Sequence, residues 1–399
     1  MTSLKDMHIS HGAKMGVRNG VEIPLSYGDT AREIAAARKH ILLTDYSHMG
    51  IAEISGEDAY EVLNTIVGGD VSALRDEQGM YTVMLDADGK IVTDVYILCD
   101  EERFIVVTEW LTGNQLRDLM QAAVDRCKDE FSEIDGVKSL DGERGALHFE
   151  GPYAWELMAG MFGMDVIGLP FHEYMYVGDD EILFRAGKHG EFSYKLIVPV
   201  GRLVDVWQQA VEAGKKFDMA VGGLDYQRQV RIENPCWDPA VLAEFSRCPV
   251  ELQMQWALRY TKDDFVGKAA LEQRLAEGVA RRAVGFELQG EHAAAAAQGD
   301  AIYCGDQKIG EVMVCGTVTE DGRHVGRAML DQALAYADIG PLRVVTAKGD
   351  AQLRTTAIPF LRNFSFMVNP SEHSYVDPAK PKHLLEQIER KKQAMAAAN

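Results

Sequence analysis

The chain has no long apolar segment and no apolar leader at its start. A membrane-spanning helix needs roughly 20 consecutive apolar residues, and no window of the sequence approaches that. The first 14 residues, MTSLKDMHISHGAK, contain no apolar core of a signal peptide. We therefore expect a protein without a membrane contact, located in the cytoplasm.

Paired cysteines and an excess of basic residues are also missing. The six cysteines are scattered, with no CxxC pair and no histidine at zinc-binding spacing, so we expect reduced thiols and no metal site. The formal net charge is −20. Because so many acidic groups repel a phosphate backbone, nucleic acid is not an expected partner.

Two nucleotide-binding signatures are absent as well. Neither GxxxxGK[ST] nor GxGxxG occurs in the sequence. The first builds the phosphate loop of many nucleotide hydrolases, and the second builds the turn under a dinucleotide. A generic enzyme of either class is therefore excluded as far as the sequence can exclude it.

The chain does have the length and composition of a folded protein with several domains. Its 399 residues exceed one ordinary core, and its 47% hydrophobic and 26% charged residues are typical of a globular chain. Strand and helix patterns alternate through the first 280 residues, which predicts mixed α and β structure.

Several elements can be placed from local patterns. The segment 50–55 (GIAEIS) alternates like a strand, and residues 59–66 have apolar positions at helical spacing. The pair at 88–89 (DG) predicts a hairpin turn between two apolar runs. A helix beginning at Arg202 is predicted to end at Gly214 in a left-handed glycine cap.

The larger organisation follows from changes in pattern. Residues 1–281 form a mixed α+β region of two units, with a boundary near 140–150, and their similar order of elements hints at a duplication. In residues 282–368, short strands are separated by glycines, which predicts a small β-barrel or sandwich. Residues 369–399 form a tail with a terminal helix that we expect to pack on the body or on a partner chain.

Seven short motifs then point to a family. They are DYSHM at 45–49, YTVML at 81–85, GKIVTD at 89–94, GP at 151–152, PVE at 249–251, DFVGK at 264–268 and IGEV at 309–312. In this order and spacing they resemble the tetrahydrofolate-dependent aminomethyltransferase family, whose founding member is the T protein of the glycine cleavage system. The resemblance implies an α+β fold with the three-domain arrangement of the T protein, and tetrahydrofolate as cofactor.

The resemblance also implies roles for individual residues. Asp94 stands where a family carboxylate contacts the reacting edge of the folate, so we expect it to stabilise positive charge on the folate nitrogen. Glu191 ends the loop at 187–191 and would accept two hydrogen bonds from the pterin. Arg231 would face the folate. Arg362 would meet the folate carboxylates.

Three further residues would border the pterin by the same analogy. Tyr81 would lie beside it, and Met49 and Leu85 would line its faces. Each is apolar or aromatic at a strand position and can equally belong to an ordinary core.

The chain departs from the family pattern at several positions. Thr93 replaces one acid of a family Asp-Asp pair, and Lys188 and His189 replace a tyrosine and a threonine. Tyr226, with a tryptophan eleven residues later, resembles the folate-dependent O-demethylases of aromatic acids. Removal of a methyl group from oxygen or nitrogen requires a proton for the leaving group, and Tyr226 or His48 could supply it.

The sequence therefore predicts a tetrahydrofolate-dependent methyltransferase that demethylates a small O- or N-methylated substrate to give 5-methyltetrahydrofolate. One alternative is an aminomethyltransferase that works with a lipoyl carrier protein. Another is a folate-binding accessory protein without turnover.

Overall fold

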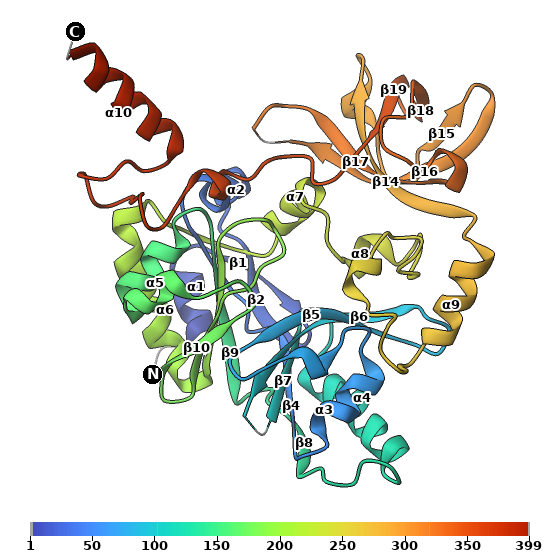
Figure 1. Cartoon of the computed structure of the whole chain (residues 1–399). Coiled ribbons are helices and arrows are strands. Elements are labelled where there is room, and N and C mark those ends of the chain that lie inside the picture. Colours follow the sequence, from blue (N-terminus) through green and yellow to red (C-terminus); the bar gives the residue numbers. More distant parts are fainter. Residues whose placement is uncertain (1–2, 102, 319, 398–399) are drawn as a thin grey trace.

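The computed structural model describes residues 3–101, 103–318 and 320–397. Two β-sheets with helices on their outer faces form one part of the molecule, and a closed β-barrel forms another (Figure 1). A segment of short helices joins the two parts. The predicted α+β fold with a C-terminal barrel is confirmed.

The first sheet has five strands and is antiparallel where its pairs are defined. Its order is β5 (Gly79–Leu85), β6 (Ile91–Asp100), β7 (Arg103–Thr108), β4 (Gly50–Ser55) and β8 (Gly136–Ser139). Helices α3 (Ala59–Ile66) and α4 (Gly113–Cys127) pack on one face through a shared apolar core. The turn between β5 and β6 contains Gly89 at φ +69°, as the Asp-Gly pair predicts.

The second sheet has six strands drawn from distant parts of the chain. Its order is β10 (Tyr174–Gly178), β11 (Glu181–Phe184), β12 (Ser193–Pro199), β9 (Arg144–Glu150), β3 (Leu42–Asp45) and β13 (Ala220–Gly222). Helices α5 (Ala154–Phe162) and α6 (Leu203–Gly214) cover one face. Because β3 pairs with β9, the early residues 42–45 belong to the second sheet, so the two units are not consecutive stretches of chain.

The inner faces of the two sheets pack against each other. Alternate residues of a strand point to opposite faces, so Val95 and Ile97 of β6 contact the helices, whereas Tyr96 and Leu98 contact the second sheet. By the same alternation Asp94 lies on the inner face. The result is four layers in the order helix, sheet, sheet and helix. Side chains from both sheets meet in the space between the two sheets.

The remaining N-terminal elements pack beside the second sheet. They are α1 (Leu4–Ser10), the hairpin of β1 (Lys14–Arg18) and β2 (Val21–Ser26), and α2 (Thr30–Lys39). Helix α2 contacts β13, β3 and α7 (Tyr226–Glu233). Helices α7, α8 (Pro239–Leu242) and α9 (Lys268–Glu277) then lead to the barrel (Figure 1).

The barrel closes six antiparallel strands around its own apolar core. Its order is β14 (Arg281–Gln289), β17 (His324–Asp331), β16 (Gln307–Thr317), β15 (Ala301–Cys304), β18 (Leu342–Thr346) and β19 (Gly349–Thr356). Closure leaves no unpaired edge strand.

The tail returns from the barrel to the second sheet. It passes beside α2 and ends in α10 (Leu384–Ala397), which projects from the body in Figure 1. Leu384, Leu385 and Ile388 are 42 to 53% exposed, so the apolar side of α10 is not covered by the body. No helix in the described part of the chain is long and apolar enough to cross a membrane.

Candidate functional site

Five ionisable side chains meet, almost fully buried, where the inner faces of the two sheets reach α7. They are Asp94 of β6, Glu109 after β7, Lys188 of the β11–β12 loop, Lys195 of β12 and Arg231 of α7. We call this group the buried charged cluster. Isolated charges are costly to bury, so the partners of each group indicate what the cluster can do.

Asp94 has one oxygen bound by protein and one oxygen free of protein donors. Its Oδ2 accepts a hydrogen bond from the Tyr81 hydroxyl at 2.8 Å and lies 2.7 Å from the Lys188 ammonium. Its Oδ1 is buried and has no hydrogen-bond partner among the described residues. Burial, reinforced by the charge of Asp94, raises the pKa of Tyr81 well above its ordinary value, so this phenol remains a donor. Asp94 Oδ1 is therefore an acceptor available to a ligand.

Glu109 links the two strongest cations of the cluster. Its Oε1 lies 3.2 Å from the Lys188 ammonium, and its Oε2 accepts a hydrogen bond from Arg231 Nη2 at 2.6 Å. Burial alone would raise the pKa of Glu109, but Lys188 and Arg231 outweigh it and hold the pKa well below 4.5. The guanidinium of Arg231 also lies 5.0 Å from the ring of Trp110, and its Nε has no partner among the described residues.

Lys195 is a fully buried ammonium, and no carboxylate of the described residues forms an ion pair with it. Its Nζ donates to the carbonyl of Ala186 at 3.0 Å and lies 4.9 Å from the centre of the Tyr96 ring. Burial lowers the pKa of Lys195 to about 8, although Glu109 opposes that shift. The Lys195 ammonium therefore loses its proton more easily than an ordinary lysine, and a bound anion would stabilise its charged form.

His48 and Tyr226 border the cluster without strong hydrogen bonds of their own. Burial lowers the pKa of His48 to about 4, and its Nδ1 has no partner in the described residues. Burial and the nearby Glu150 raise the pKa of Tyr226 well above 10. Its hydroxyl likewise makes no hydrogen bond of ordinary geometry there. Both side chains are thus neutral, and each has unused hydrogen-bonding capacity.

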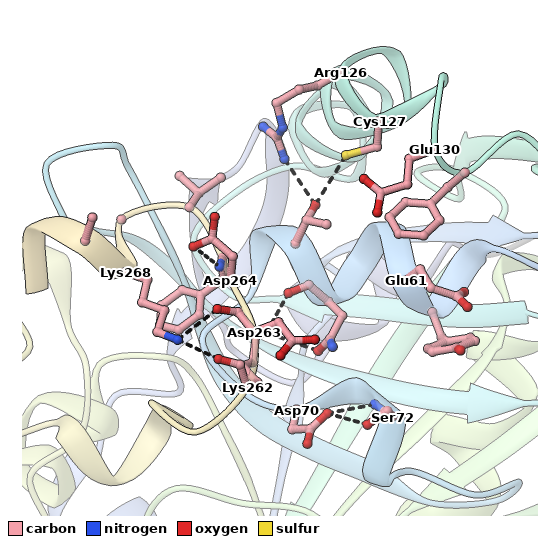
Figure 2. A pocket seen from close by; sticks show the side chains of 18 of the residues that line it. Glu61, Asp70, Ser72, Arg126, Cys127, Glu130, Lys262, Asp263, Asp264 and Lys268 are labelled. Carbon is pink, nitrogen blue, oxygen red and sulfur yellow. Dashed lines mark hydrogen bonds between the residues drawn. The ribbon is translucent and has the colours of Figure 1, made fainter. Parts of the chain in front are cut away.

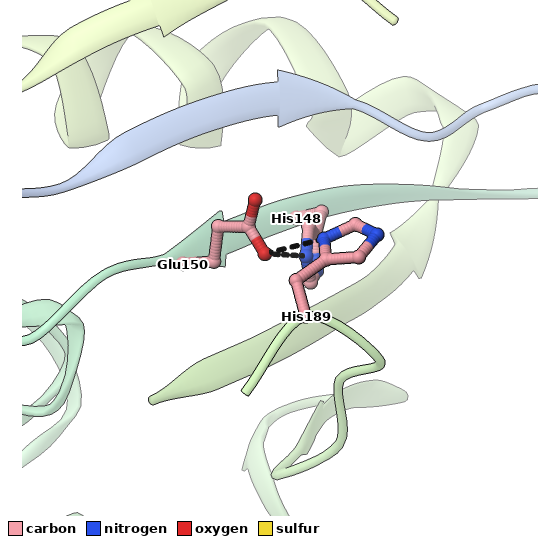
Figure 3. Close-up of side chains that lie close together, drawn as sticks. All are labelled: His148, Glu150 and His189. Atoms are coloured by element: carbon pink, nitrogen blue, oxygen red, sulfur yellow. Dashed lines mark hydrogen bonds and ion pairs between the residues drawn. The ribbon is translucent and has the colours of Figure 1, made fainter. Parts of the chain in front are cut away.

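Next to Tyr226, two imidazoles converge on one carboxylate (Figure 3). His148 Nε2 and His189 Nδ1 lie 3.4 Å and 2.9 Å from the same oxygen of Glu150, Oε2. Burial lowers the pKa of His148 to about 4 and also lowers that of His189. Against the effect of burial, the two histidines hold the pKa of Glu150 well below 4.5.

Glu191 lies in a separate network that joins α2 to the tail. Its Oε1 accepts from Arg38 Nη1 at 2.9 Å and from Asn363 Nδ2 at 2.6 Å, and its Oε2 accepts from the Ser365 hydroxyl at 2.5 Å. Arg38 also bonds Glu233 at 2.8 Å. Both oxygens of Glu191 therefore accept hydrogen bonds from protein donors. Its role as a pterin ligand remains a prediction, and it requires the N–H groups of the pterin to replace those protein donors.

The other predicted residues are divided between the cluster, the core and the surface. Tyr81 and Arg231 belong to the buried charged cluster or touch it, and Met49 packs in the apolar layer between the sheets. Leu85 packs in a different core, formed with the segment before the barrel. Arg362 is exposed on the tail. The structure thus brings together Asp94, Tyr81 and Arg231, but not Leu85 or Arg362.

Sequence reasoning missed several residues of these networks, and Lys195, Glu109 and Arg38 show how much signal the sequence carries for them. Lys195 interrupts an otherwise apolar strand, which is an available signal, because a buried strand rarely carries a lone lysine. Glu109 follows a continuously buried strand and carries a weaker signal. Arg38 looks like an ordinary basic residue at the end of a helix, and nothing local predicts its burial.

A surface hollow of about 890 Å³ lies elsewhere, on the outer side of α3 and α4 (Figure 2). Its lining includes Lys262 and Lys268. Lys262 Nζ bonds the carbonyls of Val67 and Gly69 at 2.6 and 2.7 Å, and Lys268 Nζ bonds those of Lys262 and Asp263. Because both ammonium groups already bond backbone oxygens, and none of the predicted site residues lines the hollow, we do not place the site there.

Comparison with known proteins identifies relatives along most of the chain. Residues 4–262 match the family described as the GCVT N-terminal domain. An aminomethyltransferase of Chlorobaculum tepidum is 30% identical over 361 residues, covering 88% of this chain and 95% of that protein. One of Thermotoga neapolitana is 27% identical over 366 residues, covering 90% and 97%.

A solved structure shares the fold. The crystal structure of glycine cleavage system aminomethyltransferase T from Bartonella henselae aligns with a TM-score of 0.75 at 22% sequence identity. It covers 90% of this chain and 97% of that chain. The three-domain arrangement expected from the sequence is thereby confirmed.

Proposed function

This chain belongs to the GCVT family of tetrahydrofolate-dependent transferases, and we propose that it transfers a one-carbon unit to the folate at the buried charged cluster. The observation that carries this proposal is Asp94, a buried carboxylate in a GCVT domain with one oxygen that no donor among the described residues reaches.

The residues present fit a reduced folate. A pterin offers N–H donors and ring acceptors along its edge. Around the cluster, Asp94 Oδ1 is an acceptor and Arg231 Nε and Trp110 Nε1 are donors, and all three are buried without partners among the described residues. Unsatisfied buried polar groups of both kinds are costly, and a ligand with both kinds of group would satisfy them.

Tetrahydrofolate supplies a ring nitrogen that accepts the one-carbon unit. In this proposal the Asp94 carboxylate lies beside that nitrogen and stabilises the positive charge that develops there. Lys188 and Tyr81 fix the carboxylate through its other oxygen, so Oδ1 keeps one orientation. The ring of Trp256 stacks on Tyr81 at 5.3 Å and is 66% exposed, so it covers this part of the site from solvent.

The relatives favour aminomethyl transfer as the reaction. Proteins named aminomethyltransferase match this chain over most of their own length. Under this proposal the one-carbon donor is an aminomethyl group on a lipoyl carrier protein, and that carrier is the partner. The methylene carbon would pass to the folate, and its bonds to nitrogen and sulfur would break to release ammonia and the free thiol of the carrier.

Demethylation of a small methylated substrate is the second candidate, and the pairing of Asp94 favours it. Lys188 lies 2.7 Å from Asp94 and partly neutralises the anion, which weakens its ability to stabilise an iminium-like charge. A demethylase needs instead a proton for the leaving oxygen or nitrogen, and the neutral Tyr226, which lies next to Glu150 and Tyr46, is the candidate donor.

One experiment separates the two reactions. Purified protein and tetrahydrofolate are incubated either with an aminomethylated lipoyl carrier protein or with a panel of O- and N-methylated compounds. Formation of 5,10-methylenetetrahydrofolate with the carrier supports aminomethyl transfer, and 5-methyltetrahydrofolate from the panel supports demethylation. Tight folate binding with neither product would contradict both and favour an accessory protein.

The matched variants are Asp94→Asn and Glu53→Gln. Glu53 is also a largely buried carboxylate with two basic partners, Arg103 and Lys138, but it lies away from the cluster. We expect Asp94→Asn to lower the transfer rate at least about 100-fold and Glu53→Gln to leave it unchanged.

A further inference from the structure

We propose that His148, Glu150 and His189 form a binding site for a divalent transition-metal ion (Figure 3). Each of the three side chains offers one ligand atom, and these atoms all lie within 4.8 Å of one another. The inference rests on this group alone and does not depend on the folate assignment.

The backbone holds the three donors in place without an ion. His148 and Glu150 are two residues apart on β9, so both point to the inner face of the sheet. Strand β9 is paired on both sides, by β12 and by β3. The carbonyl of His189 accepts hydrogen bonds from Arg38 and Asn363, both at 2.9 Å, which fixes the loop.

The spacing of the ligand atoms suits a metal ion. Nitrogen and oxygen ligands lie about 2.0 to 2.2 Å from zinc, so neighbouring ligands in such a site are about 3 to 3.5 Å apart. The separations from Glu150 Oε2 are 3.4 Å to His148 Nε2 and 2.9 Å to His189 Nδ1. Two imidazoles and one carboxylate suit Zn²⁺, Fe²⁺, Co²⁺ and Mn²⁺.

The site also has unused polar capacity. Glu150 Oε1, His148 Nδ1, His189 Nε2 and the Tyr226 hydroxyl are buried and have no hydrogen-bond partner among the described residues. Such groups are costly without partners. An ion bound by both oxygens of Glu150 would satisfy Glu150 Oε1, whereas His148 Nδ1 and His189 Nε2 lie on the far side of each ring from the ion. Three protein ligands leave a coordination position open to a further molecule.

The surrounding charge indicates what that molecule is. Asp94, Glu109 and Glu150 balance Lys188, Lys195 and Arg231 in number. A divalent ion would add two positive charges to this enclosed region, so we expect the open position to take an anion, such as hydroxide or a carboxylate.

Metal analysis of the untagged protein tests the site directly. After purification without chelators we expect close to one zinc, iron, cobalt or manganese ion per chain. After removal of that ion, titration with Zn²⁺ should restore one site, and Co²⁺ should give the visible absorption of a coordinated ion. His189→Ala and Glu150→Gln should weaken Zn²⁺ binding by about 100-fold or more.

The control is His8→Gln. His8 lies 3.0 Å from Asp45 in another buried pair of histidine and carboxylate, and no third histidine, cysteine or carboxylate among the described residues completes a metal-binding group with them. This variant should bind Zn²⁺ as the unaltered protein does, and circular dichroism should show all variants folded. The proposal is overturned if the unaltered protein binds neither Zn²⁺ nor Co²⁺ at micromolar concentration, or binds them no more tightly than His189→Ala. If Glu150→Gln does not fold, His189→Ala, in a loop, decides the question.

Discussion

At the scale of single residues, burial and pairing decide which predictions the structure can support. Asp94 was predicted from its place in a motif, and the structure shows a buried carboxylate with a free oxygen. Glu191 was predicted in the same way, but its oxygens meet Arg38, Asn363 and Ser365. No local pattern could show this, since two of the partners come more than 170 residues later.

The lowered pKa of Lys195 predicts that the free energy of unfolding rises at alkaline pH. Its pKa is about 8 in the folded protein and 10.5 as an ordinary lysine. Between these values the unfolded chain binds more protons, so this group raises the free energy of unfolding as pH rises from about 8 to 10.5. The gain is on the order of 3 kcal/mol.

Denaturant unfolding at several pH values measures that change. Lys195→Met should remove the rise, so the difference between the variant and the unaltered protein should shrink with increasing pH. Equal pH dependence of the two proteins would show that Lys195 keeps an ordinary pKa.

The lowered pKa of Glu109 predicts that the protein loses stability at acidic pH. Its pKa is held well below 4.5, so its stabilising effect is fully present above about 4.5 and is lost as pH falls towards the lowered value. Glu109→Gln should therefore be less stable at neutral pH but should lose less stability between pH 5 and 3. If the free energy of unfolding of the variant fell as steeply between pH 5 and 3 as that of the unaltered protein, the pairing of Glu109 with Lys188 and Arg231 would be contradicted.

At the scale of elements, local patterns predicted the strand at 50–55, the following helix and the 88–89 turn, because each depends on neighbouring residues. The cap of α6 was predicted wrongly. Gly214 has φ −69°, and the left-handed residue is Asp218. A Cβ on Gly214 would come within 3 Å of the Met219 side chain, so glycine is needed there for close packing rather than for its dihedral angles.

The tail segment before α10 is predicted to stabilise the second sheet. Asn363→Ala and Ser365→Ala each remove a hydrogen bond to buried Glu191 and should lower the free energy of unfolding by about 1 to 3 kcal/mol. Removal of residues 389–399 should leave it within about 0.5 kcal/mol, because residues 389–396 of α10 are exposed. Thermal unfolding by circular dichroism measures both, and an equal loss in all variants would refute a specific role for this tail segment.

At the scale of the whole molecule, the motifs identified the family and the pattern of short strands predicted the barrel, but neither showed the pairing of distant segments. Strand β3 enters the second sheet between β9 and β13, and the charged cluster draws on both sheets and α7. Such contacts depend on the three-dimensional arrangement rather than on spacing along the chain. Neither they nor the convergence of His148, Glu150 and His189 could be derived from the sequence.

Calorimetric titration with tetrahydrofolate under reducing conditions tests the central claim most directly, that a reduced folate binds at the cluster around Asp94. We predict one site per chain in the unaltered protein, binding weakened at least about tenfold in Asp94→Asn, and unchanged binding in Glu53→Gln. No heat of binding in the unaltered protein, or equal affinity in the unaltered protein and Asp94→Asn, would contradict it.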